Sequence, residues 1–249
     1  MQIYDLIISQ DEAISLDDVF IEEEYREKIQ RFVKEHSYRE KLIELGLEVD
    51  HKIMLYGASG CGKTMTAKAI GNALCKKVLI LNLSNIVCAR IGETSQNLKQ
   101  IFDKAKREKA ILFLDEFDLL GKSRTYDDQD VGEMKRLVNV IIQQIDLLSS
   151  DVILICATNH AEMIDTALWR RFQLRIPYQL PDREALDDYY QSLRKSFPVE
   201  LPTFDLLYDI SYAEAKDYWL TEVKKHLIAA WEKDKELSLI HISEPTRRY

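Results

Sequence analysis

Short apolar runs alternate with amphipathic stretches along the chain from residue 52 onward. Each apolar run has the length of a buried strand, and each amphipathic stretch has the period of a helix. This alternation is typical of a parallel sheet covered by helices. The predicted strands are residues 52–56, 78–83, 110–114, 152–157 and 174–180.

The stretches between these runs predict helices near residues 63–75, 94–109 and 131–148. The last of them places apolar residues at i, i+3, i+4 and i+7, which indicates one face packed on a core. Before the first strand, residues 16–46 predict a helical lead-in with Glu and Lys on its polar side. After Pro181 the chain becomes rich in charge and aromatic residues, which predicts a small helical appendage.

Composition limits the classes of protein that fit. With 249 residues and 46% hydrophobic content, the chain can form one large domain or a domain with an appendage. A net charge of -8 argues against a large nucleic-acid footprint. Because no apolar run reaches membrane-span length and the N-terminus is acidic, we expect a cytoplasmic protein with no membrane contact. The four cysteines form no C-x-x-C pair, which favours reduced thiols over a disulfide or zinc set.

The end of the chain has a different character. Residues 237–248 share no periodicity with the charged helical segment before them and resemble the translation of a common sequencing-library adapter. We therefore expect the natural sequence to end near Glu236 in this chain, with its true C-terminus missing. The predicted organisation is an N-terminal lead (1–15), an α/β core (16–180), a helical lid (181–236) and an adapter-derived tail (237–249).

A glycine-rich segment directly follows the first predicted strand and leads into a helix. It fits the pattern G-x-x-x-x-G-K-[ST], in which backbone N–H groups and the helix N-terminus surround phosphates. Lys63 can reach the β- and γ-phosphates, and Thr64 can ligate magnesium. A plain glycine-rich turn is the alternative. The segment is Gly57-Ala58-Ser59-Gly60-Cys61-Gly62-Lys63-Thr64.

Polar residues also end two later strands. The apolar run 110–114 is followed by Asp115 and Glu116, and buried unpaired charge is costly. Asp115 can hold the magnesium shell, and Glu116 can polarise a water for in-line attack. Alternatively, the two acids begin an exposed loop. Asn159 follows the run 152–157 and can sense a γ-phosphate, although Thr-Asn is also ordinary turn chemistry.

Together these motifs resemble the ATPase module of the AAA family, within the wider AAA+ class, over about residues 16–230. The resemblance implies a P-loop NTPase fold with a five-stranded parallel sheet and a helical lid. It also implies ATP with Mg²⁺ and a homo-oligomeric ring or spiral, usually of six subunits. The segments that carry it are "YGASGCGKT", "AILFLDEFD", "ICATNHAEMIDTALWRRF" and "IPYQLPDREA".

The resemblance also assigns roles to single residues. Glu116 becomes the catalytic base and Asn159 the first sensor, while Val19 and Phe20 lie in a segment that contacts adenine in the family. The segment "RRF" holds Arg170 and Arg171, which become arginine fingers that enter a neighbouring subunit's ATP site. A local salt bridge is the alternative for this pair.

Departures from the family pattern keep several functions open. Arg90 replaces an aromatic residue that peptide-threading members usually carry, and His160 follows Asn159 where arginine is frequent. The main hypothesis is an ATPase that remodels an unknown protein partner or works with an adaptor. The alternatives are a nucleotide-dependent scaffold and a loader or remodeller of nucleic acid, which Arg90 favours and the net acidity disfavours.

Overall fold

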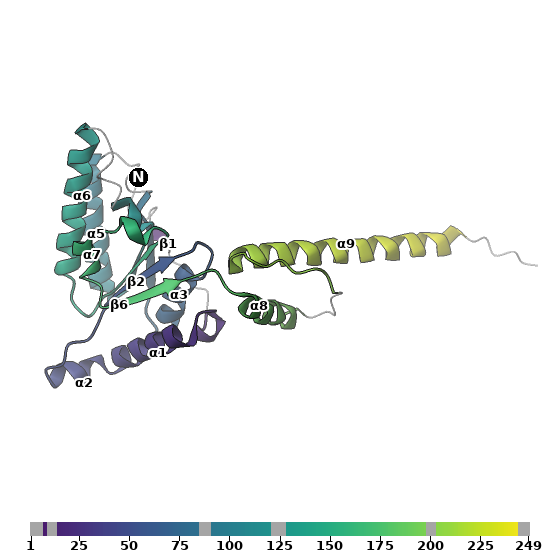
Figure 1. Cartoon of the computed structure of the whole chain (residues 1–249), viewed down its shortest axis with the longest axis horizontal. Coiled ribbons are helices and arrows are strands. Elements are labelled where there is room, and N and C mark those ends of the chain that lie inside the picture. Colours follow the sequence, from purple (N-terminus) through teal and green to yellow (C-terminus); the bar gives the residue numbers. More distant parts are fainter. Residues whose placement is uncertain (1–6, 9–13, 85–90, 121–127, 198–202, 244–249) are drawn as a thin grey trace, which may run out of the picture. The chain divides into compact units, whose positions relative to one another are not determined.

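The computed structural model describes residues 7–8, 14–84, 91–120, 128–197 and 203–243 (Figure 1). The chain divides into two compact units, Met1–Gln179 and Leu180–Tyr249. Within the described residues, none of the helices combines the length and apolar content that a bilayer crossing requires.

A six-stranded sheet forms the centre of the first unit, with the strand order β1-β3-β4-β5-β2-β6. Five neighbouring strands are parallel, which confirms the predicted five-stranded parallel sheet. The short β1 pairs with β3 in the antiparallel direction and was not predicted from the sequence. The strands are β1 (Ile7–Ile8), β2 (Lys52–Gly57), β3 (Val78–Asn82), β4 (Ile111–Asp115), β5 (Ile153–Thr158) and β6 (Leu174–Tyr178).

Helices cover both faces of this sheet, so its central strands are buried on both sides (Figure 1). On β4, Ile111 and Phe113 pack with α1 and α3, whereas Leu112 and Leu114 pack with α5 and α6. This division follows the two-residue period of a strand. In the described part of this unit, the α-helices are α1 (Glu23–Ser37), α2 (Arg39–Glu44), α3 (Lys63–Ala73), α5 (Ile91–Glu108), α6 (Asp128–Asp146) and α7 (Thr166–Trp169).

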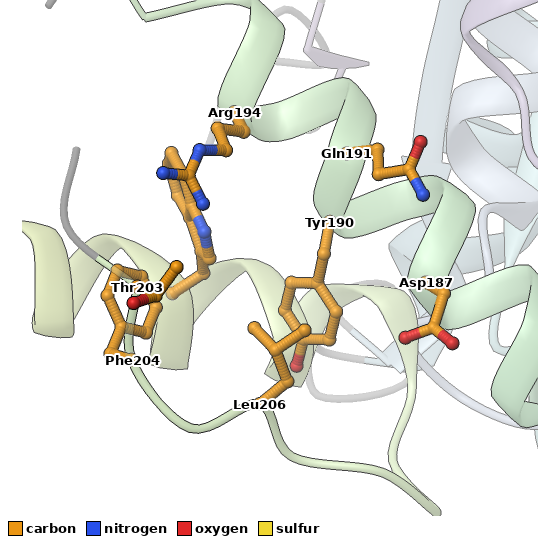
Figure 2. A pocket seen from close by; sticks show the side chains of 8 residues that line it. Asp187, Tyr190, Gln191, Arg194, Thr203, Phe204 and Leu206 are labelled. Carbon is orange, nitrogen blue, oxygen red and sulfur yellow. The ribbon is translucent and has the colours of Figure 1, made fainter. Parts of the chain in front are cut away.

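The described residues of the second unit form two helices, α8 (Arg183–Lys195) and α9 (Tyr212–Ser243). Asp182 caps α8, since its carboxylate accepts the Ala185 N–H at 2.8 Å. Leu186, Tyr190 and Trp219 belong to the small core between the helices. Figure 2 shows a hollow in this unit, lined by side chains of α8, by Thr203, Phe204 and Leu206, and by Trp219 of α9.

Helix α1 carries a buried histidine, His36. The His36 ring packs against Phe32, and its Nε2 lies 2.7 Å from the carbonyl oxygen of Asp50. Its other ring nitrogen, Nδ1, is buried without a hydrogen-bond partner. Burial lowers the pKa of His36 from 6.5 to about 4. The folded protein therefore holds this ring neutral, with Nε2–H donating to Asp50.

This burial predicts a loss of stability in mild acid. Above pH 6.5 His36 is neutral in both the folded and unfolded chain, so it does not affect their balance. Between pH 6.5 and about 4 only the unfolded chain binds the proton, which lowers the free energy of unfolding by up to about 3 kcal/mol. Urea titrations across this range should show a shallower pH dependence for His36→Phe than for the wild type. Parallel curves for the two proteins would contradict the assignment.

Candidate nucleotide-binding site

The candidate site lies along one edge of the sheet, where parallel strands end together. Tyr56 of β2 is paired with Thr158 of β5, and Leu114 of β4 is paired with Cys156 of the same strand. The residues that follow these pairs therefore all lie at the carboxyl ends of the strands, along the same side of the sheet. This edge is where open α/β sheets bind ligands. The register thus brings the phosphate loop, the acid pair and Asn159 to one side of the molecule.

Two glycines give the phosphate loop its shape. At Gly57 the backbone has φ 120°, and an added Cβ would lie 2.0 Å from the carbonyl oxygen of Tyr178. That oxygen accepts the Ala58 N–H at 2.9 Å, so the close approach includes a hydrogen bond. Gly62 precedes α3 with φ 103°, a conformation that other residues rarely adopt. The motif glycines are therefore required by the backbone path.

Lys63 begins α3 and is 8% exposed, which is unusual for a lysine. Its ammonium group donates to the carbonyl oxygens of Gly57 at 2.8 Å and Ala58 at 2.7 Å. Burial lowers the pKa of Lys63, while the nearby acidic groups, among them the carboxylates of Asp115 and Asp118, act in the opposite direction. The third N–H of Lys63 has no partner among the described residues. An anion in the loop could accept it.

The residues of the loop and those around it fit a nucleoside triphosphate with Mg²⁺. Ser59 and Gly60 at the tip of the loop are exposed, whereas Cys61 is buried and anchors the loop to the core. In the described part of the chain, no three His, Cys, Asp or Glu residues gather around a cation position. Magnesium is commonly held by one or two protein oxygens plus phosphates and water, which is what Thr64 and Asp115 offer.

The acid pair at the end of β4 is held in an uncommon conformation. Glu116 has φ 55°, in the left-handed region, and its N–H donates to Asp115 Oδ1 at 2.9 Å. Burial raises the pKa of Asp115, and the Glu116 carboxylate raises it further, while Lys63 lowers it. Non-glycine residues with positive φ gather at functional sites, because the surrounding fold must hold them there. The charge of Asp115 is therefore costly without a cation, and Glu116 lies directly beside it.

The structure adds two residues that the sequence patterns did not single out. Asp118 is 5% exposed, and its Oδ1 accepts the Thr158 hydroxyl at 3.0 Å. The oxygen of that hydroxyl in turn accepts the His160 N–H at 3.0 Å. This chain of hydrogen bonds connects the turn after the acid pair with the end of β5. The last acid of "DEFD" is the sequence signal that could have indicated Asp118.

Asn159 lies between Thr158 and His160, which this hydrogen-bond network connects. Its side chain is exposed, and so is that of His160, whose Nδ1 lies 3.2 Å from Glu162 Oε1. Thr158 before it is fully enclosed, which fixes the backbone from which Asn159 projects. The structure therefore places Asn159 at the same edge as the phosphate loop, with its amide open to solvent.

The two arginines of "RRF" differ in their surroundings. Arg171 forms two hydrogen bonds with the carboxylate of Asp146, from Nε at 2.7 Å and from Nη2 at 2.9 Å, and a third with the Ala167 carbonyl. The Arg170 side chain is exposed and has no hydrogen-bond or ion-pair partner among the described residues. The predicted local salt bridge thus exists for Arg171, while the guanidinium of Arg170 is available to another molecule.

The lead-in segment is fastened to α1. Arg26 donates to the carbonyl oxygens of Leu16 at 3.0 Å and Val19 at 2.9 Å. The Val19 side chain is buried, and Phe20 is partly exposed beside it. Their predicted contact with adenine stays a prediction. Arg90, on which the nucleic-acid alternative depends, lies outside the described residues.

The Thr158 network leads to a stability prediction. Thr158→Val keeps the side-chain shape but leaves the buried Asp118 carboxylate and the His160 N–H without this partner. We expect the free energy of unfolding to fall by about 1–3 kcal/mol, measured by urea denaturation. Thr158→Ser, which retains the hydroxyl, should lose clearly less. Equal losses in the two variants would show that the methyl contact, not the hydrogen bonds, matters here.

Comparison with known proteins places this architecture in a family. Residues 53–180 match the ATPase family associated with various cellular activities (AAA). An uncharacterized AAA family ATPase, y4kL, of Sinorhizobium fredii is 31% identical over 167 residues, which cover 67% of this chain and 50% of that protein. A putative 26S proteasome regulatory subunit homolog of Methanothermobacter thermautotrophicus is 27% identical over 197 residues, covering 76% and 52%.

A solved structure agrees at the level of the fold. The crystal structure of the FIGL-1 AAA domain superposes with a TM-score of 0.65 at 20% sequence identity, covering 80% of this chain and 65% of that one. This chain spans about half the length of the two curated relatives named above. The family match itself covers more than half of the chain and contains the phosphate loop, the acid pair, Asn159 and both arginines. The chain therefore belongs to the AAA family of ATPases.

Proposed function

We propose that this chain binds ATP with Mg²⁺, hydrolyses it and uses the cycle to remodel a protein partner. The observation that carries the proposal is the meeting of the phosphate loop with the acid pair at one sheet edge, where Lys63 and Asp115 influence each other's pKa. A buried lysine beside a carboxylate whose charge is penalised by burial is an arrangement that a metal–triphosphate complex would complete.

The residues divide the work of hydrolysis among them. The loop N–H groups and Lys63 would bind the phosphates, while Thr64 and Asp115 would hold Mg²⁺. When bound, the metal neutralises charge that develops on the phosphate oxygens. Glu116 would accept a proton as a water attacks the γ-phosphorus and the bond to the β-phosphate oxygen breaks. Asn159 would orient that water or the γ-phosphate.

Removal of the proposed base should stop turnover without stopping binding. Glu116→Gln keeps the size of the side chain but cannot accept the proton, so we expect phosphate release to fall by about 10²- to 10⁴-fold. Binding of a fluorescent ATP analogue should remain within a few-fold of wild type. Glu40→Gln changes an exposed acid on α2 and should leave turnover unaltered. Wild-type turnover in Glu116→Gln would exclude this residue as the base.

We further propose that the active form is a homo-oligomer in which Arg170 completes a neighbouring ATP site. Three observations support Arg170 over Arg171: it is exposed, it lacks a partner among the described residues, and Asp146 already holds Arg171. Arg171 would then fix the segment that presents Arg170. A guanidinium supplied by a second subunit stabilises the charge of phosphoryl transfer.

This division predicts different effects for the two arginines. Arg170→Ala should lower turnover by about 10³-fold with nucleotide binding retained, because only the charge from the neighbour is lost. Arg171→Ala should lower turnover less and also lower the melting temperature, since its bonds to Asp146 hold α7. Arg31→Ala, at an exposed arginine on α1, is the matched control. Concentration-independent turnover by a wild-type monomer would contradict the intersubunit site.

A second function uses the same site without rapid turnover. A nucleotide-dependent scaffold would need only the phosphate loop and the metal ligands, which the geometry also supports. The scaffold would be favoured if ATP binding changes the oligomeric state while Glu116→Gln behaves as the wild type. The loader or remodeller of nucleic acid has no supporting observation among the described residues.

A further inference from the structure

One buried tyrosine contacts both ends of the phosphate loop. Tyr178 is the last residue of β6 and is 4% exposed. It is paired with Gly57 in the sheet, and its carbonyl oxygen accepts the Ala58 N–H. These contacts fix the point at which the chain leaves β2 and enters the loop.

The side chain of the same residue reaches the far end of the loop. Its hydroxyl lies 2.5 Å from Thr66 Oγ1, and Thr66 is fully buried on the first turn of α3. Thr66 Oγ1 donates to the Gly62 carbonyl at 3.1 Å, so the Tyr178 hydroxyl is the donor in the shared bond. The Tyr178 ring also passes 3.9 Å from the position of a Cβ on Gly62.

Because Tyr178 and Thr66 are buried, water cannot replace a hydrogen bond that is lost between them. Burial raises the pKa of the Tyr178 hydroxyl well above its ordinary value, so the group is a neutral donor at neutral pH. Loss of the hydroxyl would leave Thr66 Oγ1 with an unsatisfied lone pair beside Gly62. A buried polar group without its partner is costly, and Thr66 Oγ1 also bonds the Gly62 carbonyl, so loss of the Tyr178 hydroxyl acts directly on the Gly62 end of the loop.

We propose that Tyr178 is a positioning residue for the nucleotide. Its hydrogen bond to Thr66, which in turn bonds the Gly62 carbonyl, holds the phosphate loop in the conformation that binds phosphate. The inference rests on the proposed binding of ATP at this loop. In this role Tyr178 does not contact a phosphate but acts through the backbone of residues 57–62. Because the chain enters the second unit at Leu180, two residues later, the same tyrosine joins the loop to the strand that leads into that unit.

The chain supplies a matched control for the test. Tyr190 is also 4% exposed, and its hydroxyl donates to the Leu207 carbonyl at 2.9 Å inside the second unit. Tyr178→Phe and Tyr190→Phe therefore each remove one hydrogen-bonded hydroxyl from a buried tyrosine, one beside the loop and one in the second unit. Both should lower the melting temperature.

Affinity for a fluorescent ADP analogue, measured by titration of each purified protein, distinguishes a positioning role from a structural one. We expect Tyr178→Phe to raise the Kd by about 5- to 10-fold and Tyr190→Phe to change it less than two-fold. Thr66→Val should reproduce the effect, Thr66→Ser should restore most of the affinity, and the double variant Tyr178→Phe/Thr66→Val should bind no more weakly than the weaker single variant.

The outcomes separate the two proposals. Equal Kd values for the wild type and Tyr178→Phe, with nucleotide bound by both, would overturn the positioning role and leave the proposed function intact. A multiplied loss in the double variant would also overturn it, because the two hydroxyls would then act independently. Failure of the wild type to bind the analogue would overturn the proposed function, and the positioning role with it.

Discussion

Parallel pairing of β2 with both β5 and β6 determines where the phosphate loop begins and what surrounds it. The pairing sets Gly57 against Tyr178 and Tyr56 against Thr158, so the strand ends reach one edge together. A shift by one residue would turn every side chain of β2 to the opposite face. The apolar residues of β2 contribute to the cores on both faces, which makes such a shift costly. Core packing therefore fixes the geometry of a polar site.

The site brings together groups that each carry an energetic cost, either a buried charge or an uncommon backbone conformation. Burial raises the pKa of Asp115 and lowers that of Lys63, which means that both charged forms have lost hydration. Glu116 adds a backbone conformation that few residues adopt. The Thr158–Asp118 hydrogen bond and the Tyr178 contacts hold these groups in place. A phosphate with its metal would provide the opposite charges that the site lacks, which is the physical reason to place nucleotide there.

The sequence predicted the parallel strands to within two residues at each end, because short buried strands read as uninterrupted apolar runs. It also predicted that the glycine-rich segment follows one strand and the acid pair another, as they do after β2 and β4, while their roles stay predictions. It missed Asp118 and Tyr178. Their partners Thr158 and Thr66 lie 40 and 112 residues away in the chain, and only the sheet register brings them together. The strand β1 was missed because its two residues are too few to show a pattern.

Binding of nucleotide to the phosphate loop is the claim on which hydrolysis, the role of Arg170 and the role of Tyr178 all depend. Isothermal titration calorimetry of the purified chain with ATP and Mg²⁺ measures it directly, and Lys63→Ala removes the buried cation at the centre of the site. The account predicts one nucleotide per chain for the wild type and an affinity at least about ten-fold weaker for Lys63→Ala, in keeping with the loss of a charge-assisted hydrogen bond. Absence of binding by the wild type, or equal affinity in the two proteins, would contradict it.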